Sequence, residues 1–112
     1  MTVITDEFMR EMIARSRTYT LVILKATPKR NEPGADAIVR EHARRNFALR
    51  AEGTLSIVGP ISDESDVRGI GVFNAGPDEV RKLMEDDPGV KAGIFSYEIH
   101  VCRSFPGDSL PH

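Results

Sequence analysis

The chain of 112 residues contains only one cysteine, Cys102. A single thiol cannot form a disulfide within the chain, and it does not supply the ligand set of a structural zinc site. No two of the three histidines have the spacing of metal ligands. We therefore expect no metal site, and the lack of disulfides predicts a reducing, cytoplasmic setting.

Excess positive charge and long apolar runs are lacking too. Fifteen Lys and Arg residues stand against seventeen Asp and Glu residues, for a net charge of −2, so no basic surface for phosphates is expected. The longest apolar run, Leu21–Leu24, is too short to cross a bilayer. Charged residues throughout Met1–Arg17 argue against a signal peptide. We expect neither nucleic acid nor membrane as a partner.

A dinucleotide-binding loop is missing as well. Gly69 and Gly71 begin a glycine pattern, but Asn74 stands at the place of the third glycine. The segment also does not open a helix within a parallel strand–helix–strand unit, where such a loop binds its pyrophosphate. We therefore expect no cofactor.

Length and composition indicate one globular domain over residues 1–112. The chain is too short for separate cofactor and substrate domains. Its 40% hydrophobic and 29% charged residues are typical of a globular protein rather than a disordered one. We expect residues 1–17 to form a helical N-terminal extension and residues 106–112 to form a C-terminal tail.

Periodicity and turn signals predict a helix followed by six elements of a main fold. The predicted elements are a helix over Thr5–Arg15, a strand over Tyr19–Ala26, a helix over Ala35–Glu52, strands over Leu55–Val58 and Gly69–Phe73, a helix over Pro77–Glu85 and a strand over Gly93–Cys102. We expect Gly59-Pro60 to end the second strand. The order predicts an α+β, ferredoxin-like βαββαβ fold, with two helices on one face of a four-stranded antiparallel sheet.

The second face of this sheet raises the question of what covers it. The first strand is apolar on both faces, whereas an antiparallel strand with one wet face alternates. The two apolar sets are Tyr19, Leu21 and Ile23 on one face and Val22, Leu24 and Ala26 on the other. We expect a second copy of the chain to cover that face in a sheet-on-sheet homodimer or larger homo-oligomer. The alternative is that the N-terminal helix covers it.

Two polar residues of the first main helix fall within its apolar arc. With about 100° per residue, His42 and Asn46 lie between Leu49 and Val39 on the helical wheel. An unpaired buried polar group costs about 1–3 kcal/mol, so both side chains need partners or a polar pocket. The alternative is a core histidine that is satisfied by a backbone carbonyl.

Asp86-Asp87-Pro88 follows the second main helix. Carboxylates are unfavourable at the negative end of a helix dipole, so these acids need a reason. One reason is a turn hydrogen bond ahead of the proline. The other is a carboxylate that orients an imidazole and raises its basicity.

A family resemblance rests on five short segments of the chain. These segments are Glu41-His42-Ala43-Arg44, Glu52-Gly53-Thr54-Leu55, Val58-Gly59-Pro60, Asp87-Pro88 and Ala92-Gly93-Ile94-Phe95. Their arrangement resembles the YciI-like (YCII-related) family, over Tyr19 to Phe105. The resemblance implies a dimeric, ferredoxin-like α+β fold, related to muconolactone isomerases and to a chlorohydroxyhydroquinone dehydrochlorinase.

The resemblance also implies a catalytic dyad of a histidine on the first helix and an aspartate before a proline. The matching positions are His42 and Asp87. Such a pair performs acid/base chemistry without a cofactor, as in an isomerisation or elimination on a small cyclic or aromatic acid or phenol. We expect Asn46, Ser56 and Arg68 to contact this ligand. The alternatives are a binding or accessory module without turnover and a purely structural dimer.

Overall fold

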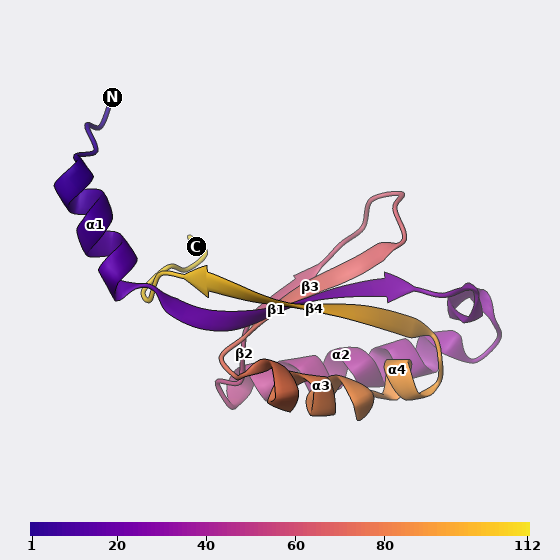
Figure 1. Ribbon diagram of the computed structural model, residues 1–112. Helices are drawn as coiled ribbons and strands as arrows, with labels where there is room; N and C mark the ends of the chain where they lie inside the picture. The colour runs from indigo at the N-terminus through magenta and orange to yellow at the C-terminus, as the bar shows by residue number, and fades with distance from the viewer.

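The computed structural model describes residues 1–112 as a four-stranded antiparallel sheet with helices packed on one face (Figure 1). The elements are α1 (Asp6–Arg15), β1 (Arg17–Ala26), the 3-10 helix η1 (Pro28–Asn31), α2 (Ala35–Ala51), β2 (Leu55–Pro60), β3 (Val67–Phe73), α3 (Pro77–Glu85), α4 (Pro88–Lys91) and β4 (Phe95–Ser104). The strand order is β2-β3-β1-β4. The α+β class and the ferredoxin-like βαββαβ order are confirmed.

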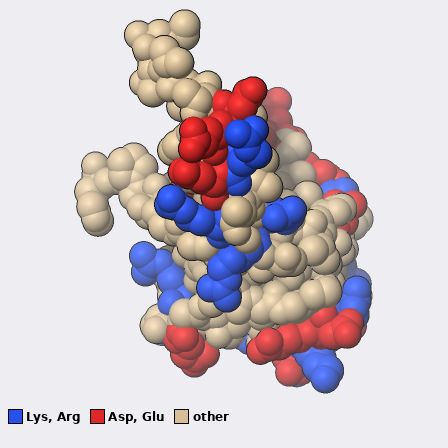
Figure 2. Space-filling view, turned by 60° about the vertical axis from the view of Figure 1, so that its left-hand side comes forward, with Lys and Arg blue, Asp and Glu red and all other residues tan.

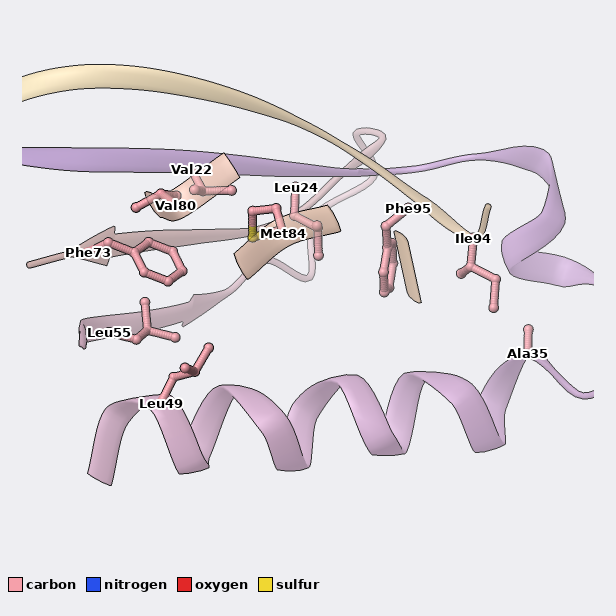
Figure 3. Packing of buried hydrophobic residues seen from close by; sticks show 10 residues of the cluster. All are labelled: Val22, Leu24, Ala35, Leu49, Leu55, Phe73, Val80, Met84, Ile94 and Phe95. Atoms are coloured by element: carbon pink, nitrogen blue, oxygen red, sulfur yellow. The ribbon is translucent and has the colours of Figure 1, made fainter. Parts of the chain in front are cut away.

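The hydrophobic core lies between the sheet and its helices (Figure 3). On the central strand β1, Thr20, Val22 and Leu24 are buried on the helix side, while the residues between them are only partly buried. The core consists of Val22, Leu24, Ala35, Leu49, Leu55, Phe73, Val80, Met84, Ile94 and Phe95. Its side chains fill the space above α2, which fixes the helix that carries His42 against the sheet.

Strand β2 extends further than the sequence predicts. The prediction that Gly59-Pro60 ends the second strand is wrong, because β2 continues to Pro60. β2 is an edge strand, where a proline is tolerated. A Cβ atom on Gly59 would lie 2.8 Å from Cγ1 of Ile70, so glycine permits this close pairing.

The sequence prediction also lacks the short helix α4. Asp87 is its N-cap residue and Pro88 stands in its first turn. Both residue types are preferred at these positions, so the signal for a helix start was present at Asp87-Pro88. The acids therefore stand at the start of a helix as well as after the end of α3.

Helix α1 does not cover the second face of the sheet. Figure 1 shows it projecting beyond the end of the sheet, and none of its residues is buried. The alternative in which the N-terminal helix covers that face is therefore wrong. The uncovered face carries Leu21 beside Val72 and Ile23 beside Ile70. No helix is both long and apolar enough to cross a membrane.

We expect Gly89→Ala to destabilise the protein. A Cβ atom there would lie 2.5 Å and 2.9 Å from two ring carbons of Phe95 and 3.1 Å from Oδ2 of Asp87. Overpacking of this kind costs about 1–3 kcal/mol, which urea unfolding measures as a lower free energy of unfolding. Gly76→Ala is the matched control, because no atom lies within 4 Å of its added carbon. Equal stability of the two variants would contradict the packing account.

Candidate active site

Helix α2 places His42 against the buried carboxylate of Asp87. His42 Nδ1 lies 2.7 Å from Asp87 Oδ1, and the two residues are 9% and 1% exposed. A carboxylate only accepts hydrogen bonds, so Nδ1 carries the proton and donates it to Asp87. In the neutral imidazole, Nε2 is then the free base.

Asp87 uses its two oxygens for two different contacts. Oδ2 accepts hydrogen bonds from the backbone N–H groups of Gly89 at 2.9 Å and Val90 at 3.2 Å, and so caps α4. Oδ1 holds His42. The turn hydrogen bond and the orientation of the imidazole, which the sequence left as alternatives, are thus both present. The neighbouring Asp86 is exposed and pairs with Lys91 instead.

The charged form of Asp87 is favoured in spite of its burial. Burial raises the pKa of this carboxyl, but the hydrogen bond and charge of His42, together with two backbone N–H groups, outweigh burial. The pKa of Asp87 is therefore held below its ordinary value. At neutral pH the imidazole of His42 therefore donates its hydrogen bond to a charged carboxylate.

Asn46 lies one helical turn after His42 and contacts its other ring nitrogen. Asn46 Nδ2 is 3.2 Å from Nε2, and the amide donates because Nε2 has no proton in this tautomer. The ring of Phe95 lies 4.9 Å from the imidazole, centroid to centroid. Both polar partners of His42 are side chains, so the alternative of a backbone carbonyl partner is wrong.

His42 and Asn46 lie in the wall of a cavity between α2 and the sheet. The cavity has a volume of about 240 Å³, and eleven of its nineteen lining residues are hydrophobic. Its guanidinium groups come from Arg30 and Arg68, and no carboxylate lines it. Ser56 does not line this cavity and lies instead in a second hollow beneath the C-terminal tail.

Arg68 is held at the cavity by backbone carbonyl oxygens. Its guanidinium donates to the carbonyls of Ser65 at 2.6 Å and of Asp63 and Val67 at 3.3 Å. No carboxylate forms an ion pair with it, whereas Arg30 is paired with Asp36 at 2.9 Å. The side chain of Arg68 is therefore fixed by neutral carbonyl groups, and the exposed carboxylate of Asp63 attracts it from beyond ion-pair distance.

Arg45 is a site residue that the sequence reasoning missed. Its Nη1 lies 3.7 Å from Oδ1 of Asp87, and its side chain is 25% exposed. On the helical wheel it falls about 20° beyond Ile38, at the edge of the apolar arc that contains His42. This position on the helical wheel was the signal that could have identified Arg45. Arg45 adds a second positive group to the buried carboxylate, from the same face of α2.

We expect acid to destabilise the parent protein more than Asp87→Asn. The pKa of Asp87 is lower in the folded than in the unfolded chain, so the carboxylate stabilises the fold above the ordinary aspartate range near pH 4. This stabilisation is lost as the pH falls through the folded pKa. Urea unfolding between pH 7 and about pH 3 tests this. At pH 7 the variant should lose about 1–3 kcal/mol.

Asp63→Asn is the control for this pH series. Hydrogen bonds from Ser65 also lower the pKa of Asp63, but its carboxyl is exposed. Its substitution should leave most of the acid dependence in place. Parallel pH profiles for the parent and Asp87→Asn would contradict a buried, charged Asp87.

Comparisons with known proteins agree with this fold. The model of the YCII-related domain matches residues 18–103. Among solved structures, the chain is similar to 5-chloro-2-hydroxyhydroquinone dehydrochlorinase from Burkholderia phenoliruptrix AC1100 in complex with 2,5-dihydroxybenzoquinone. The TM-score is 0.50 and the identity 22%, over 73% of this chain and 90% of that chain. None of the curated proteins matches the chain.

Proposed function

The chain belongs to the YCII-related domain family, and from this premise we propose that it is a small enzyme with His42 and Asp87 as an acid/base dyad. The observation that carries the proposal is the 2.7 Å contact between them, made in the wall of a cavity. A base that is oriented by a buried carboxylate and faces a pocket is the arrangement that general acid/base catalysis uses.

In the proposed reaction, His42 Nε2 takes a proton from a substrate carbon or hydroxyl group. Asp87 stabilises the imidazolium that forms, because its negative charge lies on the opposite ring nitrogen. In an isomerisation, the same proton returns to another atom of the substrate. In an elimination, the electron pair left by the proton forms a double bond and the leaving group departs as an anion. Neither reaction needs an oxidant or a cofactor.

The proposed substrate is a small ring compound with an acidic or phenolic oxygen. An apolar cavity of about 150 Å³ suffices for benzene, so the cavity of about 240 Å³ has space for one ring with substituents. The guanidinium of Arg68 favours an anionic oxygen, and Asn46 offers an amide to a second polar group. The complex of the similar dehydrochlorinase with 2,5-dihydroxybenzoquinone supports this substrate class. Ser56 lies outside this cavity.

One contact favours a second function, that of a binding module without turnover. The amide of Asn46 occupies Nε2 at 3.2 Å, as it would for a histidine that serves only to hold the pocket. Catalysis requires the substrate to replace this amide at Nε2. In the binding module the amide stays in place, and the ligand is held by Arg68 and the apolar walls.

The proposal also covers the assembly and its setting. We regard residues 1–112 as one domain that works as a cytoplasmic homodimer or larger homo-oligomer. Support comes from the uncovered sheet face, where Leu21, Ile23 and Val72 are only partly buried in the single chain. An apolar face of this kind is typical of an interaction surface.

We expect His42→Asn to lower turnover strongly and to preserve ligand binding. Small ring acids and phenols, among them 5-chloro-2-hydroxyhydroquinone, should be tested for conversion by ultraviolet absorbance and for chloride release. Loss of the base should lower kcat by about 100- to 10,000-fold. Binding of 2,5-dihydroxybenzoquinone, measured by calorimetry, should change only a few-fold.

His112→Asn is the matched control, because His112 is exposed in the C-terminal tail, away from the cavity. Its kcat should equal that of the parent. Binding of the quinone without conversion of any compound would favour the binding module. Equal loss of activity in both variants would contradict a specific role for His42.

A further inference from the structure

The N-terminal segment carries most of the exposed large hydrophobic side chains. Of ten such side chains, six belong to residues 1–13, namely Met1, Val3, Ile4, Phe8, Met9 and Ile13. Within α1, Phe8 and Met12 are four residues apart, as are Met9 and Ile13. This spacing gathers the four side chains into one apolar stripe along the helix. No other part of the chain buries this stripe, since α1 has no buried residue.

The junction between α1 and the sheet keeps this stripe away from the rest of its own chain. Ser16, the only residue between α1 and β1, donates its N–H to the carbonyl of Ile13 at 3.1 Å. Arg103 of β4 donates to the hydroxyl of Ser16 at 2.5 Å and to the carbonyl of Ile13 at 3.4 Å. In Figure 1, α1 accordingly stands clear of the sheet, on the side opposite α2, α3 and α4.

A helix of this length needs a partner to persist. α1 has ten residues, and isolated helices below about 12–15 residues are marginal in water. It also lies outside the YCII-related match, which begins at residue 18. Helix α1 and the surface that covers it are therefore an addition to the domain that the family shares.

The charges of α1 match those of a second α1 in the opposite direction. Asp6 and Glu7 lie in its first turn, and Arg15 lies in its last turn. In an antiparallel pair, each acidic first turn therefore stands beside a basic last turn, and the helix dipoles are opposed. The apolar stripe lies between these charged ends, so in such a pair it packs against the stripe of the second copy. Figure 2 shows acidic and basic groups close together on the projecting segment, below an uncharged tip.

We infer that α1 is a self-association element, which pairs antiparallel with α1 of a second copy through the stripe of Phe8, Met9, Met12 and Ile13. Such a pair has two-fold symmetry, the commonest symmetry of homo-oligomers. The inference is independent of the chemistry at His42. A membrane surface fits α1 less well, because membrane-surface helices are rich in Lys and Arg, whereas α1 has three acids and two arginines.

Sedimentation equilibrium of the full chain tests the pairing. Phe8→Glu places a charge within the stripe and should weaken self-association roughly tenfold or more, with loss of one two-fold step, from dimer to monomer or from tetramer to dimer. Arg10→Gln is the control, because Arg10 points away from the stripe and should not change the mass. Unchanged association of Phe8→Glu, or a parent that is monomeric at all concentrations, overturns the inference.

A second variant separates pairing from loss of the helix itself. The double variant Phe8→Ala, Ile13→Ala removes apolar area from the stripe, whereas alanine is the best helix former, so the helix propensity of α1 rises. Association should still weaken, because the pair then buries less apolar surface. Unchanged association of this double variant overturns pairing through the stripe.

Discussion

The hydrogen bond between His42 and Asp87 joins parts of the chain that are 45 residues apart. His42 belongs to α2, the first main helix, and Asp87 begins α4 just before the last strand. Leaving one partner of a buried hydrogen bond unsatisfied costs about 1–3 kcal/mol, a sizeable part of the roughly 5–15 kcal/mol that stabilises a domain. Gly89 lets α4 approach Phe95, and Phe95 stands against the imidazole. The same carboxylate therefore sets the position of α4, of the aromatic ring and of the proposed base.

This arrangement explains how a buried carboxylate can be both structural and chemical. The oxygen that caps α4 is satisfied by backbone groups, so the other oxygen is left to His42 and the more distant Arg45. Because all of these partners are positive or donate hydrogen bonds, Asp87 keeps its charge in a buried place. That charge keeps the ring proton of His42 on Nδ1 and leaves Nε2 as the hydrogen-bond acceptor.

Much of the fold could be predicted from the sequence because its signals are local. Gly53 follows α2 with a positive φ of 83°, which glycine adopts readily after a helix, and the hydroxyl of Thr5 accepts from the N–H of Phe8 and caps α1. The parts that were missed depend on neighbours in space. β2 continues through Pro60 because it lies at the sheet edge, and α1 stands free because Ser16 and Arg103 fix its exit.

The site was only partly predictable for the same reason. The wheel of α2 marks His42 and Asn46 as polar residues in an apolar arc, but it does not say that one side chain binds the other. The choice of Asp87 over Asp86 came from the resemblance, and the contact with His42 depends on the packing of α4 against α2. Ser56 was expected to contact the ligand, yet it lies where the pairing of β2 with β3 shifts register, between Leu55 and Ile57.

The most direct measurement is the NMR detection of the ring N–H proton of His42, in the parent and in Asp87→Asn. The account predicts that in the parent this proton lies on Nδ1 and exchanges slowly with water, because it is held in a buried hydrogen bond of 2.7 Å to the Asp87 carboxylate. Exchange should be faster in Asp87→Asn, whereas the exposed His112 should show no protected ring proton in either protein. A His42 proton on Nε2 in the parent, or equally fast exchange in both proteins, would contradict the dyad.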